Sequence, residues 1–178
     1  NISREGSSDT ALFRVLGGEG TVESVEFRNI NVSGGENTGV VAGRNVGEIN
    51  NVTVRGSNIT GAENTSSIAG VNEATISKTD IIDTAVNGSS NVGGIAGTNT
   101  VDIGNITAEN ATVSGTGTIG GVIGNNEAAI ENITVNESKV DGEADAIGGV
   151  IGNSAGSVTN ATVADTNVTG ANGVGGVA

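Results

Sequence analysis

Four of the six pairs of adjacent glycines in this sequence are the first residues that could do chemistry, because a glycine-rich loop can hold a phosphate. The pairs are Gly93-Gly94, Gly120-Gly121, Gly148-Gly149 and Gly175-Gly176. A dinucleotide or P-loop site places such glycines between a strand and a helix, and the P-loop adds a lysine. The sequence shows no helical periodicity and no Gly-Lys-Ser/Thr segment. We therefore interpret the pairs as corners of a structural unit.

Catalytic and metal-binding candidates are few, because the chain has no His and no Cys. That excludes Ser-His-Asp and Cys-His nucleophiles and zinc sites of the usual type. Paired carboxylates such as Asp141, Glu143 and Asp145 could serve in a solenoid glycosidase. Calcium could bind there or near Asp80 and Asp83, since oxygen ligands suffice. No acidic position recurs along the chain, so we assign no catalytic residue, cofactor or metal and predict a protein that is not an enzyme.

The Asn-x-Ser/Thr pattern, an acceptor of N-linked glycans, occurs twelve times. Seven of these asparagines are expected at strand edges or in loops, and we predict them as glycosylation sites: Asn31, Asn58, Asn64, Asn87, Asn110, Asn136 and Asn167. Four others share one repeated corner position: Asn51, Asn105, Asn132 and Asn160. If these four turn inward as a hydrogen-bonded ladder they cannot carry sugar, and we group them with the structural corner residues.

A repeat of about 27 residues organises the whole chain. Each copy has a glycine after an apolar pair, at Gly17, Gly43, Gly70, Gly97, Gly124 and Gly152, and the intervals are 26, 27, 27, 27 and 28. Val or Ile recurs at fixed distances from this glycine, as at Ile49, Ile76, Ile103, Ile130 and Val158. Short alternating stretches such as Ile133 to Val135 indicate strands, and no single copy could bury its own apolar face.

Stacked copies would bury those faces, because each strand could pair in parallel with its equivalent one coil away, at about 4.8 Å. The sequence therefore predicts an all-β fold, a parallel β-solenoid of about six coils with roughly three short strands per coil. A β-sandwich would not need the same residue type at one position in every copy. A propeller blade needs about 40 residues or more.

Glycine and asparagine mark the predicted corners. Gly and Asn tolerate the left-handed backbone conformation that tight corners need. Asn recurs two residues after the glycine, at Asn45, Asn72, Asn99 and Asn126. Stacked Asn side chains can hydrogen-bond along a rod, so we expect a ladder at this position.

The combination of GVIG-like segments, Gly-x-Asn, Ile-x-Asn and an apolar strand resembles the GLUG-motif repeats of secreted bacterial and archaeal proteins. The opening LFRVLGGEGTVESVEFRNINVSG is similar to a first copy of such an array. The resemblance covers residues 11–178, although the aromatic position common after Ile-x-Asn is Val, Ile or Thr here. It implies a β-solenoid in surface proteins, adhesins or appendages of larger enzymes, and no catalytic residue.

Composition and charge narrow the function further. A net charge of −13 disfavours nucleic acid and anionic membranes as partners, and no membrane insertion is expected in this segment. We expect residues 1–10 to be a flank or part of a cap, and residues 11–178 to be one continuous solenoid cut part-way through a coil. Expected partners are other copies, the rest of a larger chain, or glycans and neighbouring cell surfaces.

Three functions remain open at this stage. The first is a structural or adhesive module of a glycosylated cell-surface or extracellular filament protein. The second is a carbohydrate-binding or carbohydrate-active solenoid. The third is ice binding through the outward threonines Thr53, Thr107, Thr134 and Thr162, a row that Asp80 interrupts.

Overall fold

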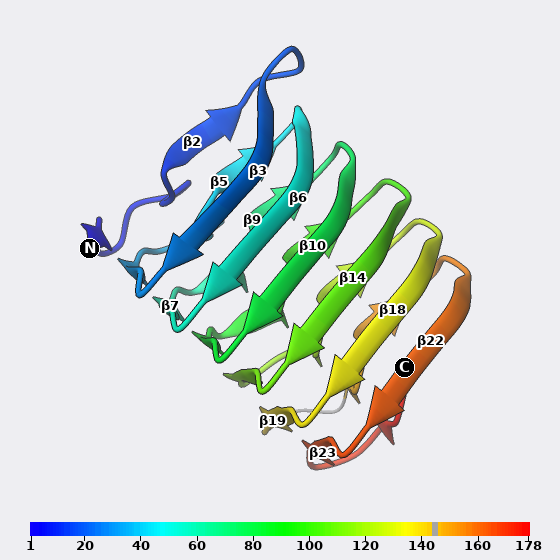
Figure 1. Cartoon of the computed structure of the whole chain (residues 1–178). Coiled ribbons are helices and arrows are strands. Elements are labelled where there is room, and N and C mark those ends of the chain that lie inside the picture. The colour runs from blue at the N-terminus through cyan, green and yellow to red at the C-terminus, as the bar shows by residue number, and fades with distance from the viewer. Residues whose placement is uncertain (144–145) are drawn as a thin grey trace.

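A computed structural model describes residues 1–143 and 146–178, and those residues form a stack of β-coils with no helix (Figure 1). Because no described residue is helical, none belongs to a helix that could span a membrane. Every strand pair is parallel, and the partners lie 27 to 30 residues apart in sequence. The predicted parallel β-solenoid with a period near 27 is therefore confirmed.

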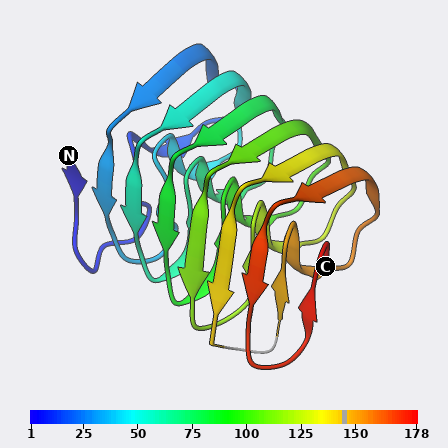
Figure 2. The ribbon, with the colours of Figure 1, turned by 60° about the horizontal axis from the view of Figure 1, so that its bottom comes forward.

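Four sheets run along the rod, and each takes one strand from a coil. Sheet I contains β2 (Phe13–Leu16), β5 (Ala42–Asn45), β9 (Ala69–Asn72), β13 (Ala96–Asn99), β17 (Ile123–Asn126) and β21 (Ile151–Ser154). Sheet II contains β3 (Thr21–Arg28), β6 (Glu48–Arg55), β10 (Ile76–Ile82), β14 (Ile103–Glu109), β18 (Ile130–Asn136) and β22 (Val158–Ala164). Figure 2 shows the same coils from another side, with each strand beside its equivalents.

The other two sheets have shorter strands. Sheet III contains β1 (Ile2–Ser3), β4 (Asn31–Ser33), β7 (Asn58–Thr60), β11 (Ala85–Asn87), β15 (Thr112–Gly115), β19 (Lys139–Gly142) and β23 (Asn167–Thr169). Sheet IV contains β8 (Glu63–Ser66), β12 (Ser90–Gly93), β16 (Ile119–Gly120), β20 (Ile147–Gly148) and β24 (Val174–Gly175). A complete coil thus has four strands rather than the roughly three expected, because sheet IV adds a strand of two to four residues.

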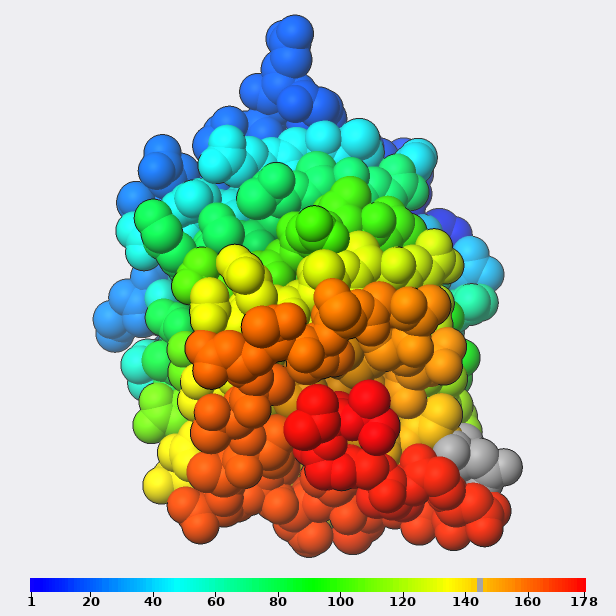
Figure 3. Space-filling model, turned by 90° about the vertical axis from the view of Figure 1, so that its right-hand side faces the viewer, coloured from blue at the N-terminus to red at the C-terminus, as the bar shows by residue number. Residues whose placement is uncertain are grey.

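The core consists of Val and Ile columns that stack on themselves inside the rod. In sheet II, Ile49, Ile76, Ile103 and Ile130 form one such column, and each is at most 3 % exposed. β-branched side chains suit this packing because they fill a pleated surface with little rotamer freedom to lose. The last coil is less covered: Val158, Val163 and Val168 are only partly buried. Figure 3 shows this coil at the end of the rod, in orange and red.

Residues 1–10 join the first coil. Ile2 and Ser3 pair with Val32 and Ser33 in sheet III. Thr10 forms a bridge to Thr38, where later coils place the strands of sheet IV. The segment that we expected as a flank or part of a cap therefore supplies the first rungs of two sheets.

The predicted alignment of the first repeat with the second is wrong by three residues. Gly17 was matched with Gly43, but the structure pairs Val15 with Arg44 and Leu16 with Asn45, so Arg14 lies opposite Gly43. The later glycines pack against a corner of the preceding coil: a Cβ on Gly43 would lie 2.5 Å from the Asp9 Cα atom. Arg14 has no described coil before it, so a side chain fits there. Gly17 instead lies in the longer turn between β2 and β3, which protrudes in Figure 1.

Candidate functional site

A buried row of amides runs along the corner between sheets I and II. It consists of Asn45, Asn72, Asn99 and Asn126, each fully buried. The Nδ2 group of each asparagine donates to the Oδ1 atom of the next at 2.8 Å, and Asn126 donates to Ser154 Oγ at 3.2 Å. Asn99 and Asn126 also donate to the backbone carbonyl two residues further on, at 2.7 and 2.6 Å. The row satisfies polar groups that would be costly to bury unpaired.

A second row of hydrogen-bonded amides was not predicted from the sequence. It runs through Asp9, Asn37, Asn64 and Asn91, and each asparagine Nδ2 group donates back to the preceding coil at 2.9, 2.9 and 3.1 Å. All four residues have positive φ, between 48° and 54°. Their backbones are the surfaces against which Gly43, Gly70, Gly97 and Gly124 pack. The signal was present in the sequence, as an Asn six residues before three of the glycines, but Asn64 was interpreted only as a glycan acceptor.

The third row lies on the outer face of sheet II. Asn51, Asn105, Asn132 and Asn160 are exposed and have φ between 52° and 58°. Each is left out of the pairing register together with its equivalent in the neighbouring strand, so the strands of sheet II are interrupted at the same place by a left-handed residue. Asn160 donates to Asn132 at 2.7 Å and Asn132 donates to Asn105 at 3.4 Å. These side chains therefore point outward rather than into the core.

The seven predicted glycan acceptors are scattered over the rod. Five are exposed, at Asn31, Asn58, Asn87, Asn110 and Asn167, and two are half-buried, at Asn64 and Asn136. Several are held by the neighbouring coil: Asn58 Nδ2 donates to Asn31 Oδ1 at 3.2 Å, and Asn110 Nδ2 donates to Asp83 Oδ1 at 2.8 Å. Asn64 is the most enclosed, because its Oδ1 atom accepts from both Asn91 and Thr98.

Charged side chains form exposed ion pairs rather than a buried catalytic set. Arg55 Nη1 lies 3.2 Å from Asp83 Oδ2, and Arg44 Nη2 lies 2.6 Å from Glu73 Oε2. Hydrogen bonds from Lys139 and then Thr169 lower the pKa of the Asp141 carboxyl, together with the positive charge of Lys139. Of the earlier calcium candidates, Asp145 lies outside the described residues. Within the described residues, no three acidic side chains come together as a metal-binding group.

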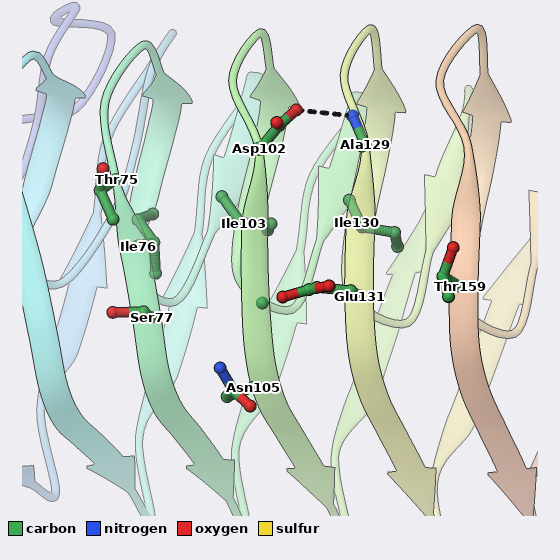
Figure 4. A pocket seen from close by; sticks show the side chains of 11 residues that line it. Thr75, Ile76, Ser77, Asp102, Ile103, Asn105, Ala129, Ile130, Glu131 and Thr159 are labelled. Atoms are coloured by element: carbon green, nitrogen blue, oxygen red, sulfur yellow. Dashed lines mark hydrogen bonds between the residues drawn. The ribbon is translucent and has the colours of Figure 1, made fainter.

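A depression of about 350 Å³ interrupts the outer face of sheet II (Figure 4). The outward row across four strands reads Ser77, Gly104, Glu131 and Thr159, and the missing side chain at Gly104 leaves the hollow. Ser77, Asp102, Asn105, Glu131 and Thr159 lie around it, and Ile76, Ile103 and Ile130 line it beneath. The sequence reading did not single out this place, because Gly104 sits outside the repeated glycine positions.

The fold is similar to one solved structure, described as "a putative immunoglobulin A1 protease from Bacteroides ovatus". The TM-score is 0.61 at 22% identity, and the match covers 99% of this chain and 65% of that one. This chain thus spans less than two thirds of the length of that chain, and at this identity the likeness shows the fold alone. No protein-family model matches the chain, and no curated protein matches it either. The likeness to GLUG-motif repeats therefore stays a prediction.

Proposed function

We propose that this chain is a non-catalytic structural or adhesive module of a glycosylated cell-surface or extracellular filament protein. The observation that carries the proposal is that rows of polar side chains run along the rod on several faces. These side chains form hydrogen bonds to equivalent residues of the neighbouring coils. Such a molecule offers length and an extended surface. Its net charge of −13 keeps copies soluble and apart except where they are joined specifically.

Five of the seven predicted acceptors are exposed on the outer surface, which supports glycosylation in a secreted setting. Equivalent sequons in adjacent coils lie only about 4.8 Å apart, so neighbouring rungs cannot all carry bulky glycans. We therefore propose partial occupancy, with glycans on well-separated coils.

The protease name of the similar structure does not change this proposal. The chain has neither His nor Cys, so it lacks the base or nucleophile of Ser-His and Cys-His proteases. Ice binding is the weaker alternative, because the outward row that contains Thr53 and Thr107 begins with Glu26 and is interrupted by Asp80.

The test uses the native protein on its own cells. Antibody against residues 1–178 should label intact cells, and the isolated protein should have a mass above that of the bare polypeptide, with the excess removed by deglycosylation. Labelling only after lysis would contradict the surface location, and a bare polypeptide mass would contradict glycosylation.

A further inference from the structure

We propose that the depression at Gly104 is a binding site for a single neutral sugar residue of a polysaccharide or glycan. This inference goes beyond the structural role, because a rod could perform that role without any ligand. It also does not depend on where the protein is located. The outward polar row of sheet II is broken at this place, between Ser77 and Glu131.

The break is created by one residue. In the outward row of sheet II, Asn50 Nδ2 donates to Ser77 Oγ at 3.1 Å, and the following place is Gly104. A Cβ atom there would lie 2.9 Å from Glu131 Cγ and 3.0 Å from the Glu131 backbone oxygen. Gly104 therefore allows the Glu131 side chain to lie across the neighbouring strand, as Figure 4 shows. The hollow and the position of the carboxylate have the same cause.

The groups around the hollow keep unused hydrogen-bonding capacity. The Glu131 carboxylate has no hydrogen-bond or ion-pair partner within residues 1–143 and 146–178, although its backbone pairs within sheet II. Asp102 accepts from the Ala129 N–H group through Oδ1 at 3.0 Å (dashed in Figure 4), which leaves Oδ2 free to accept. Ser77 Oγ accepts from Asn50, so its O–H group remains a donor, and Asn105 accepts through Oδ1, so its Nδ2 group remains a donor. Donors and acceptors thus lie together around one open surface.

This combination selects a class of ligand. A sugar ring carries several neighbouring hydroxyl groups, and each of them both donates and accepts hydrogen bonds. The described residues that line the hollow include two carboxylates and no Lys or Arg, which opposes the binding of an anion. The volume of about 350 Å³ lies at the small end of ligand sites, which suits one ring. The chain has no Trp or Tyr and only two Phe, and neither Phe lines the hollow, so there is no aromatic stacking platform. We therefore expect weak affinity, with a Kd on the order of 1 mM.

The experiment is an NMR titration of ¹⁵N-labelled protein with the methyl glycosides of glucose, galactose, mannose and N-acetylglucosamine, each tested separately. We expect at least one of them to shift the backbone amide signals of Ser77, Gly104, Asn105 and Glu131 in a saturable way. Two variants should weaken that binding at least fivefold: Glu131→Gln, which removes the unpaired charged acceptor, and Gly104→Ser, which fills the hollow.

Glu109→Gln is the matched control, because it removes a carboxylate from the same sheet face outside the hollow and should leave the affinity unchanged. Far-UV circular dichroism and thermal midpoints must agree among the variants, so that a lost fold is not mistaken for a lost site. The proposal is overturned if no glycoside shifts these amides, or if the shifts are spread along the rod. It is also overturned if Glu109→Gln weakens binding as much as Glu131→Gln, or if calcium chloride alone saturates the same amides. None of these results would bear on surface labelling or glycan mass.

Discussion

Replacing Asn126 by alanine tests whether the buried amide row holds adjacent coils together. Asn126 accepts from Asn99 at 2.8 Å and donates to the Ala128 carbonyl at 2.6 Å and to Ser154 Oγ at 3.2 Å. The residue is fully buried, so water cannot replace these partners. At about 1 kcal/mol for each lost hydrogen bond, the substitution should lower the free energy of unfolding by about 3 kcal/mol.

The neighbouring Asn125 provides the control, because it lies in the same strand but its side chain faces outward. The Asn125 side chain accepts a hydrogen bond from Asn153 Nδ2 at 2.8 Å on the exposed surface. Asn125→Ala should therefore cost less than about 1 kcal/mol. Both variants remove the same atoms from adjacent positions, so the difference between them reports burial and pairing rather than strand propensity.

The assay is urea unfolding followed by far-UV circular dichroism, since the chain has no Trp or Tyr for fluorescence. With a slope of about 2 kcal/mol per M, Asn126→Ala should lower the midpoint by about 1.5 M. A stacked array can unfold in steps, so the amplitude and the midpoint of each step are compared. Equal midpoints for the two variants would refute the view that the buried amide row is a main source of cohesion.

Three further predictions concern the corners and the surface charge. Gly97→Ala places a Cβ 2.5 Å from the Asn64 Cα atom, so it should lower the free energy of unfolding by about 2 kcal/mol. Arg14→Ala, in the equivalent place at the first coil, should change that free energy by less than about 0.5 kcal/mol. Equal losses for the two variants in the same urea assay would argue against the packing role of the glycine. Lys78→Asn should raise the thermal midpoint, because Lys78 has φ of 50° and Asn adopts that conformation at lower cost; an unchanged or lowered midpoint would contradict this. Because the pKa of Asp141 is lowered in the folded state, its carboxylate stabilises the fold above the unfolded-state pKa, and this contribution is lost as the pH falls through the folded-state pKa. Asp141→Asn should therefore flatten the acid side of a profile of stability against pH. An unaltered profile would count against the stabilising contacts of Asp141 with Lys139 and Thr169.

The sequence predicted the fold because its core positions repeat with one residue type. Ile49, Ile76, Ile103 and Ile130 could be aligned by counting alone, and they stack in the structure. Sheet IV escaped notice because its inward column changes chemistry along the rod. The column begins with Thr10, Thr38 and Thr65 and continues with Val92, Ile119, Ile147 and Val174. The buried threonines fit because each hydroxyl donates to the carbonyl three residues earlier.

Two features of the candidate sites could not be predicted from the repeat. The first is the hollow at Gly104, because it depends on a single departure from the pattern and on where a neighbouring Glu131 side chain then lies. The second is the direction of the corner asparagines. Asn105 and Asn126 both stand in Asn columns, yet one points outward and the other is fully buried, and only the local backbone decides between these outcomes.

The two amide rows also give the rod an electrical property. In the row from Asn45 to Asn126 every N–H group points toward the C-terminal end, a direction fixed by the Gly47 N–H group at one end and the Ala128 carbonyl near the other. In the row from Asn91 to Asp9 every N–H group points toward the N-terminal end, because a carboxylate can only accept. The side-chain dipoles of the two rows therefore oppose each other. Where both rows are present, adding a coil adds one amide dipole in each direction, so these two rows together build up little net dipole along the axis.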